Sequence, residues 1–268
     1  MTYERQQVLL TLENVSLKLG ENQILENVNA KVHNIHRPGM TQGQVIGFLG
    51  PSGRGKTQMS RVLSGLQRPT SGRVLVGEEQ KPARVGSMGM VMQHYPLLEH
   101  RTIEGNLLLA ASLGGLDHEE AMTRIKAYLV RFNLDDKRDF YPAQLSGGQR
   151  QRIAIVQQLL SSEHFLIMDE PFSGLDPMMK EEACKLIREI AATDELLTII
   201  VITHDIQAAC TISDTLWLLG WPPGQRHGST LRFEIDLMER GLAWQDFAER
   251  TVQFEQTIRE VNGRFHEL

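Results

Sequence analysis

The sequence has little cysteine, no long hydrophobic run and no excess of basic charge. Its two cysteines, Cys184 and Cys210, are far apart in a chain of 268 residues, which argues against a disulfide framework or a zinc cluster and fits a reducing cytosol. No apolar run approaches the ~18 residues that a membrane-crossing helix needs, and the first residues lack the apolar core of a signal peptide. The net charge of -5 argues against sequence-independent binding of nucleic acid. We therefore expect a cytosolic protein that does not itself cross a membrane.

Short apolar runs separated by turn residues predict two kinds of β-structure. Residues 8–19 and 24–32 are β-rich, with apolar runs at 8–12 and 24–28, and they flank the turn-forming 20–22, so they predict an antiparallel pair. Three further runs are almost wholly apolar, as in parallel strands covered on both faces, and lie at residues 45–49, 165–168 and 197–202. An α/β protein is therefore expected.

Between residues 102 and 162 the apolar residues recur at helical spacing alone, which predicts an all-helical insertion. The expected helices cover residues 103–113, 119–132 and 148–161. Residues 33–42 contain Pro38 and Gly39 and have no apolar period, so they predict an exposed loop. Residues 221–268 read as a small tail with a strand near 229–235 and a terminal helix within 244–265.

A glycine-rich segment follows the strand at 45–49 and precedes a helix, which is the context that a phosphate-binding loop requires. Its residues are Gly50-Pro51-Ser52-Gly53-Arg54-Gly55-Lys56-Thr57. The glycines allow successive N–H groups to point inward, and the helix N-terminus adds positive potential, so phosphate is the expected ligand. We expect Lys56 to reach the terminal phosphates of ATP and the Thr57 hydroxyl to coordinate Mg²⁺.

Two acidic residues, Asp169 and Glu170, end the apolar run at 165–168. An isolated pair of this kind is usually solvated surface, but ligands of open α/β sheets bind at the carboxyl ends of the strands. We expect Asp169 to hold Mg²⁺ and Glu170 to act as the base that polarises the water attacking the γ-phosphate.

The residues Ser146-Gly147-Gly148 open a predicted helix with a hydroxyl, bare N–H groups and a helix dipole. They therefore form a second expected anion site. A single chain does not obviously need two such sites for one γ-phosphate.

Four ordered motifs make the chain resemble the ATP-binding-cassette (ABC) ATPases over residues 8 to about 220. They are Gln93 in Val91-Met92-Gln93, the segment Leu145-Ser146-Gly147-Gly148-Gln149, the segment Ser173-Gly174-Leu175-Asp176, and Thr203-His204-Asp205. The resemblance implies a head-to-tail dimer in which each ATP lies between one phosphate loop and the other subunit's residues 146–149. It also implies that Gln93 contacts Mg²⁺ and water, that Asp176 crosses the interface and that His204 contacts the γ-phosphate.

The resemblance further implies a RecA-like P-loop NTPase core with an N-terminal antiparallel β subdomain and an inserted helical subdomain. We expect an ATPase domain over residues 1–220, with the core at 1–95 and 163–220 and the helical subdomain at 96–162, followed by the tail at 221–268.

One position departs from the family pattern. Leu19 stands where an aromatic residue usually stacks on adenine, and stacking on a base is worth ~1–3 kcal/mol. This departure predicts weak ATP binding with poor base discrimination, unless another aromatic residue such as Tyr3 compensates.

A cassette with no membrane span resembles the separate ATPase subunit of a bacterial transporter, peripheral on the cytoplasmic face of the cell membrane. The implied partners are a second copy or a related cassette and integral membrane subunits, which would dock near Pro96, Leu97 and Leu98, with no nucleic acid. Import of a small solute is expected, and the tail loosely resembles the nitrate, sulfonate and taurine importer branch. The alternatives are a lipid or lipoprotein transporter and a non-transport soluble ABC ATPase.

Overall fold

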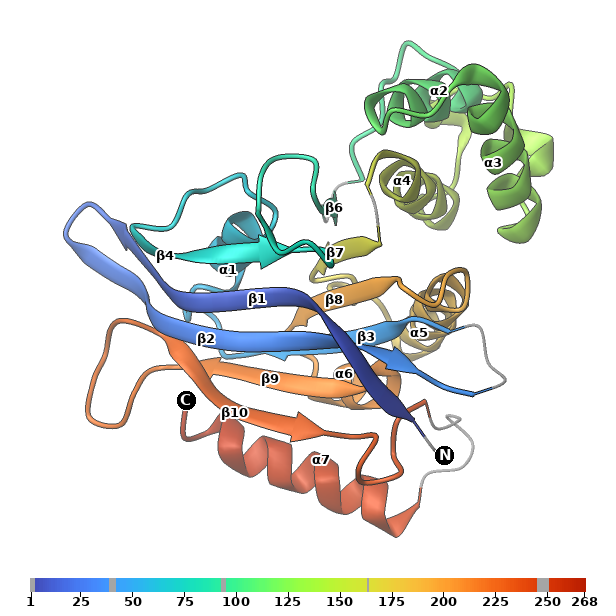
Figure 1. The fold of residues 1–268 in the computed structure, drawn as a ribbon. Helices are drawn as coiled ribbons and strands as arrows, with labels where there is room; N and C mark the ends of the chain where they lie inside the picture. The colour runs from blue at the N-terminus through green and yellow to red at the C-terminus, as the bar shows by residue number, and fades with distance from the viewer. Residues whose placement is uncertain (1–2, 39–41, 93–94, 163, 245–250) are drawn as a thin grey trace.

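The computed structural model describes residues 3–38, 42–92, 95–162, 164–244 and 251–268. It contains two β-sheets, helices packed on the larger sheet, and a group of helices that forms a lobe to one side (Figure 1). Within these described residues, no helix is both long and apolar enough to span a bilayer. The predicted α/β fold with an antiparallel β part and a helical insertion is confirmed.

The smaller sheet is antiparallel and has the strand order β2-β1-β4-β5. Its strands are β1 (Glu4–Leu19), β2 (Asn22–His36), β4 (Ser71–Val76) and β5 (Lys81–Pro82). The predicted antiparallel pair is confirmed, and β1 and β2 extend only a few residues beyond the predicted stretches at 8–19 and 24–32.

The prediction of an exposed loop over residues 33–42 is wrong where the structure describes it. Strand β2 continues to His36, which pairs with Glu4, and the Arg37 side chain is buried. The Arg37 guanidinium forms an ion pair with the buried carboxylate of Asp214 and donates to the carbonyl oxygen of Gly43 at 3.0 Å. Paired in this way, an arginine can be buried where composition predicts solvent exposure.

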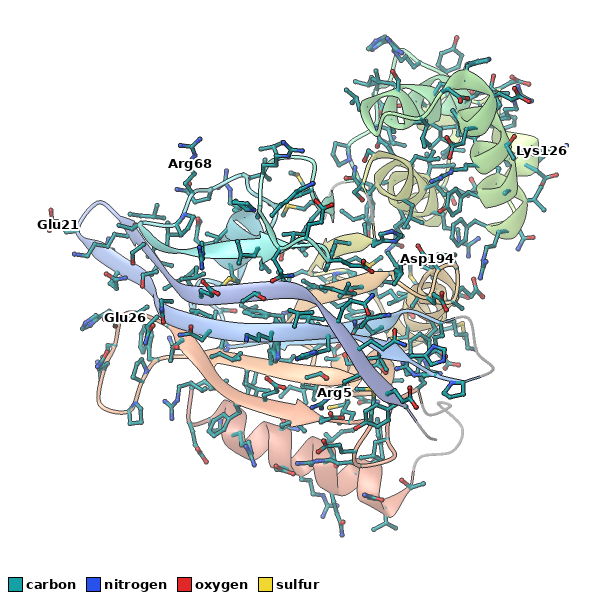
Figure 2. The ribbon with its side chains drawn as sticks, in the orientation of Figure 1. Arg5, Glu21, Glu26, Arg68, Lys126 and Asp194 are labelled. Carbon is teal, nitrogen blue, oxygen red and sulfur yellow. The ribbon has the colours of Figure 1, made fainter. Side chains whose placement is uncertain are left out.

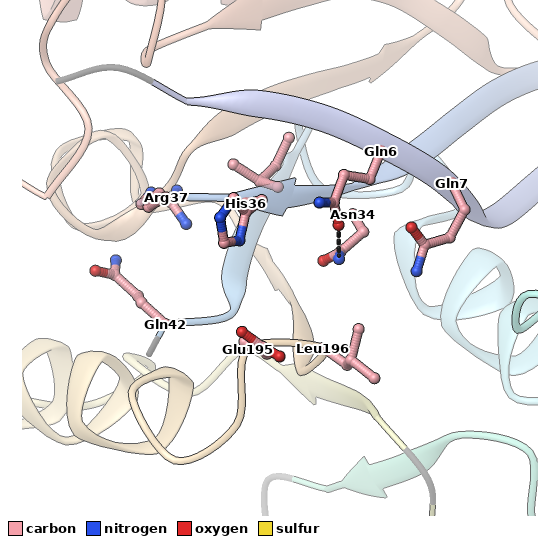
Figure 3. A pocket seen from close by; sticks show the side chains of 9 residues that line it. Gln6, Gln7, Asn34, His36, Arg37, Gln42, Glu195 and Leu196 are labelled. Carbon is pink, nitrogen blue, oxygen red and sulfur yellow. Dashed lines mark hydrogen bonds between the residues drawn. The ribbon is translucent and has the colours of Figure 1, made fainter. Parts of the chain in front are cut away.

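A polar cavity of about 310 Å³ lies beside this segment, where β1 begins, β2 ends and the connection before β8 passes (Figure 3). Asn34 projects from β2 towards β1, and its Nδ2 donates to Gln6 Oε1 at 3.0 Å. Glu195 faces the two strands from the opposite wall (Figure 3). The segment that ends at buried Arg37 is therefore bordered by a polar cavity.

The larger sheet has the order β10-β9-β3-β8-β7-β6, and all of its strands are parallel except β10, which pairs antiparallel with β9. The strands are β3 (Gln44–Leu49), β6 (Gly89–Val91), β7 (Phe165–Asp169), β8 (Thr198–Thr203), β9 (Thr215–Gly220) and β10 (Thr230–Asp236). The residues predicted as a tail therefore contribute β10 to the main sheet.

Alternate residues of the central strands face two different hydrophobic cores. In β8, Ile199 and Val201 pack with the helices of one face, whereas Ile200 and Ile202 pack with the smaller sheet and α1. The helices on the larger sheet are α1 (Lys56–Leu63), α5 (Pro177–Ala191), α6 (Ile206–Ile212) and α7 (Val252–Phe265). This double coverage is the physical reason for the unbroken apolar runs.

The helical lobe has the predicted helices with small shifts at their ends. It comprises α2 (Ile103–Leu113), α3 (His118–Arg131) and α4 (Gly147–Ser161), with short 3₁₀ turns at Asp135–Lys137 and Pro142–Gln144. Leu97 is buried in the core below this lobe, whereas Pro96 is exposed. Leu97 therefore supports the lobe from inside rather than lining an open groove.

We expect Arg37→Met to lower the free energy of unfolding by about 3–5 kcal/mol near pH 8, because it leaves the Asp214 charge buried without its cation. Burial raises the pKa of Asp214 to about 6, and losing Arg37 raises it further. A carboxyl whose pKa is raised in the folded state stabilises the fold at low pH, and this contribution is lost as pH rises through that pKa. The destabilisation caused by Arg37→Met should therefore be smaller at pH 5 than at pH 8. Urea unfolding at both pH values measures it.

The matched control is Arg5→Met, because Arg5 is half-exposed and pairs with Asp236 at the surface. Its expected cost is at most about 1 kcal/mol. Equal losses for the two variants, or a loss for Arg37→Met that does not change with pH, would contradict the buried-pair explanation.

Candidate active site

The phosphate loop connects β3 to α1 and contains two residues in left-handed conformations. Gly53 and Gly55 have φ of 79° and 83°, and Gly55 precedes α1 without any side-chain cap on the helix. A Cβ atom on Gly50 would lie 2.6 Å from the carbonyl oxygen of Leu219 in β9. The glycines therefore let the loop curl tightly and lie against the neighbouring strand, leaving the helix N-terminus available to an anion.

Lys56, the first residue of α1, folds back over the loop. Its Nζ donates to the carbonyl oxygen of Gly50 at 2.8 Å and lies 3.9 Å from Glu170 Oε1. Burial lowers the pKa of Lys56, while the carboxylates of Glu170 and Asp169 oppose that shift. The ammonium group is thus held between the loop and the acidic pair.

Arg54 behaves differently from the rest of the loop. Its Nε donates to the carbonyl oxygen of Leu268 at 2.9 Å, and its guanidinium lies 3.5 Å from the centre of the Trp221 ring. The Arg54 side chain is therefore engaged by the end of β9 and by the C-terminal residue, so its main chain is the part left to contact phosphate.

Asp169 and Glu170 follow β7 at the same edge of the sheet as the phosphate loop. Burial, then the neighbouring Glu170, raises the pKa of Asp169, whereas Lys56 and a hydrogen bond from Ser60 act in the opposite direction. Glu170 has a left-handed φ of 52°, and its N–H donates to the carbonyl oxygen of Ile202 at 2.8 Å. Pairing with β8 thus fixes a backbone conformation that non-glycine residues seldom adopt.

The carboxylate of Glu170 is oriented by Thr203, the last residue of β8, and by His204, the residue after it. Thr203 Oγ1 donates to Glu170 Oε2 at 3.1 Å and accepts from the N–H of Asp205 at 3.0 Å. His204 Nδ1 lies 2.9 Å from Glu170 Oε2, while the imidazole stays largely exposed. Sequence reasoning missed the part played by Thr203, although a hydroxyl at the end of a buried strand beside His204 was the available signal.

The predicted magnesium ligands offer oxygen atoms, which is the donor type that Mg²⁺ prefers. Thr57 is exposed in the first turn of α1, and Asp169 is half-buried opposite it. The described residues hold no cluster of three or more His, Cys, Asp or Glu that could cage a metal by themselves. This donor set fits an ion bound by one carboxylate, one hydroxyl and substrate phosphates.

The structure does not bring every predicted site residue to this location. Ser146 caps α4 in the helical lobe, where its side chain accepts from the N–H of Gln149 at 3.3 Å and Gln149 Oε1 accepts from the N–H of Ser146 at 2.9 Å. A Cβ on Gly147 or Gly148 would meet nothing within 4 Å. Asp176 caps α5 and is exposed. No described residue therefore requires glycine at positions 147 and 148.

Two other predicted residues need separate mention. Gln93 lies outside the described residues. Leu19 ends β1 with 39% of its surface exposed, at the β1–β2 turn.

The family model described as ABC transporter matches residues 36–173, just over half of the chain. This chain belongs to the ABC transporter family. As a member, it is the ATP-binding, ATP-hydrolysing type of subunit, in agreement with the phosphate loop and acidic pair described above.

Relatives of known name agree with this assignment. A Chlorella vulgaris protein named "Probable sulfate/thiosulfate import ATP-binding protein CysA" is 34% identical over 213 residues, covering 78% of this chain and 86% of that protein. The Cereibacter sphaeroides "Methionine import ATP-binding protein MetN" is 39% identical over 172 residues, covering 61% of this chain and 48% of its own length. This ABC chain thus spans about half the length of the methionine-import relative.

Solved structures also match almost the whole chain. The structure of cbiO1 from Clostridium perfringens, described as part of the ABC transporter complex cbiONQ, has a TM-score of 0.73 and 26% identity, covering 98% of this chain and 97% of that one. A structure described as the ATP binding subunit of an ABC transporter has a TM-score of 0.68 at 23% identity, which supports the fold alone.

Proposed function

We propose that two copies of this ABC ATPase, or one copy and a related cassette, close on ATP and Mg²⁺ and thereby drive import of a small solute through separate membrane subunits. The observation that carries the proposal is that the two anion-binding elements of one chain lie in different parts of the fold. The phosphate loop lies at the sheet edge, while the exposed start of α4 lies in the lobe with two sterically unnecessary glycines. A second chain can supply the missing half of each site.

Within one half, the proposed roles follow from the contacts. Thr57 and Asp169, with Gln93, would hold Mg²⁺, which supplies charge stabilisation for the phosphates when bound. Lys56 and the main-chain N–H groups of residues 50–57, except Pro51, which has none, bind the phosphate oxygens. Glu170 accepts a proton from the attacking water, with Thr203 fixing its carboxylate.

His204 contacts Glu170 through Nδ1. A carboxylate oxygen accepts hydrogen bonds, so Nδ1 carries the hydrogen in that contact, and Nε2 can donate to a γ-phosphate oxygen when the ring carries a second hydrogen there. His204 thus ties the position of the base to the presence of the phosphate.

We expect Glu170→Gln to keep ATP binding but lower turnover by about 10²–10⁴-fold, the usual contribution of a general base. Thr203→Val removes the hydrogen bond that orients Glu170 and the one that the hydroxyl accepts from the N–H of Asp205, but it keeps the base itself, so it should give a smaller loss, about tenfold. Steady-state hydrolysis and equilibrium ATP binding measure the two effects. Hydrolysis by Glu170→Gln near the wild-type rate would remove Glu170 from the base role.

The second half of the site is proposed to come from the partner's Ser146, Gly147, Gly148 and Gln149, with Asp176 crossing the interface. Two exposed apolar side chains beside Asp176 support this arrangement. Met178 and Met179, at the start of α5, expose 75% and 48% of their surface. Exposed apolar side chains next to a motif residue fit a protein–protein contact.

We expect Gly148→Asp to fold normally, since its Cβ points into open space, but to place a carboxylate where the partner's γ-phosphate would lie. In a Glu170→Gln background, ATP should produce a dimer in sedimentation velocity, and adding Gly148→Asp should abolish it. Gly263→Asp is the matched control, because Gly263 is also an exposed helical glycine with open space at Cβ. An ATP-dependent dimer that persists with Gly148→Asp would contradict the head-to-tail arrangement.

The names of two relatives, a sulfate/thiosulfate and a methionine import protein, support import of a small solute. An import role in turn implies a peripheral position on the cytoplasmic face of the membrane. The narrower placement in the nitrate, sulfonate and taurine branch rests on the tail alone. Docking on membrane subunits is proposed to use the surface that begins at exposed Met92 and Pro96.

Affinity purification of a tagged chain from solubilised membranes of the source organism tests the partners. We expect integral membrane transporter subunits to co-purify. If these subunits belong to a lipid or lipoprotein transporter, the cargo is a lipid or lipoprotein and not a small solute. Recovery of ribosomes, DNA or soluble proteins alone would contradict the transport role.

A further inference from the structure

A second cavity, of about 620 Å³, opens beside the phosphate loop. Gly53 lies at its edge, and the rest of its wall comes from the β1–β2 turn, the start of β2 and the segment that connects β9 to β10. Figure 1 shows this last segment reaching towards the tip of the β1–β2 hairpin. The size is within the ~300–1,000 Å³ of ordinary ligand pockets. Any nucleotide whose phosphates occupy the loop must place its base in a neighbouring space such as this one.

Trp221 is the one large aromatic side chain among the described residues that line this cavity. Tyr3, the other aromatic considered for a base contact, cannot take part. It precedes β1, which runs from Glu4 to Leu19 and at ~3.3 Å per residue is about 50 Å long. Figure 2 shows Arg5 and Glu21 far apart at the two ends of this hairpin.

Two hydrogen bonds fix the main chain of Trp221, and a cation covers one face of its ring. The main-chain N–H of Trp221 donates to the carbonyl oxygen of Leu268 at 3.1 Å, and the main-chain carbonyl oxygen of Trp221 accepts from Arg232 at 2.6 Å. Arg54 covers one face of the ring. A ring fixed in this way loses little conformational freedom when a ligand stacks on it.

We propose that Trp221 is the stacking platform for the nucleobase, on the ring face opposite Arg54, and that it replaces the aromatic side chain that Leu19 does not provide. The inference rests on the proposed binding of ATP at the phosphate loop. The contact between Arg54 and Trp221 also connects the stacking ring to the phosphate-binding part of the site, because Arg54 belongs to the phosphate loop. Since every base has a stacking face, the platform serves adenine and guanine alike.

The test compares ATP, GTP and inorganic tripolyphosphate, which has the phosphates but no base, by isothermal titration calorimetry with Mg²⁺. Trp221→Ala should raise the dissociation constants of ATP and GTP by about 5- to 150-fold, the factor that stacking typically contributes. Tripolyphosphate binding should be unchanged. Trp221→Phe should recover most of the lost affinity, and Leu19→Ala should change ATP binding less than Trp221→Ala does.

Each other outcome overturns the proposal in a recognisable way. If Trp221→Ala weakens tripolyphosphate as much as ATP, Trp221 acts only by supporting Arg54 and the loop. If Trp221→Ala binds ATP like the wild type, or if Leu19→Ala is the more damaging change, the base lies elsewhere while ATP binding itself stands. If the wild-type chain binds neither ATP nor tripolyphosphate, the proposed nucleotide site fails as well.

Discussion

The parallel pairing of β8 with both β3 and β7 is the constraint on which the active site depends. It brings the carboxyl ends of three strands to one edge of the sheet, so the phosphate loop, the acidic pair and His204 meet although they are far apart in sequence. The hydrogen bond from Glu170 N–H to Ile202 continues this pairing one step beyond the strands and fixes the unusual φ of Glu170. The residues proposed to ligate or react are thus positioned by main-chain hydrogen bonds, which depend little on the side chains themselves.

Local patterns in the sequence predicted the elements whose cause is local. The glycines of the phosphate loop and the Ser146 cap of α4 act within a few residues of themselves, and the apolar runs of β7 and β8 reflect burial on both faces. The same local signals placed Asp169 and Glu170 at a strand end. They could not show how Thr203 and His204 would contact Glu170, because that contact depends on which strands are neighbours.

Features that arise from distant pairing were missed for the same reason. The ion pair of Arg37 with Asp214 joins residues separated by 177 positions, and nothing near Arg37 in sequence indicates a buried partner. The strand expected near residues 229–235 is present as β10, but its antiparallel pairing with β9 was not predicted, because such pairing leaves no mark on either strand alone. Trp221 could not be recognised as part of the cavity beside the phosphate loop until β9 was known to lie beside β3.

The exposed methionines at the start of α5 have a chemical consequence of their own. Met178 and Met179 lie at the surface, where peroxide can reach their sulfur atoms, whereas Met59 and Met168 are enclosed in the two cores. Oxidation to the sulfoxide turns an apolar side chain into a polar one and disrupts methionine-rich contacts. Oxidation would therefore reach Met178 and Met179, beside Asp176 in the proposed dimer interface, before it reached the methionines of the two cores. The proposed pairing with a second copy would then weaken while the phosphate loop stayed intact.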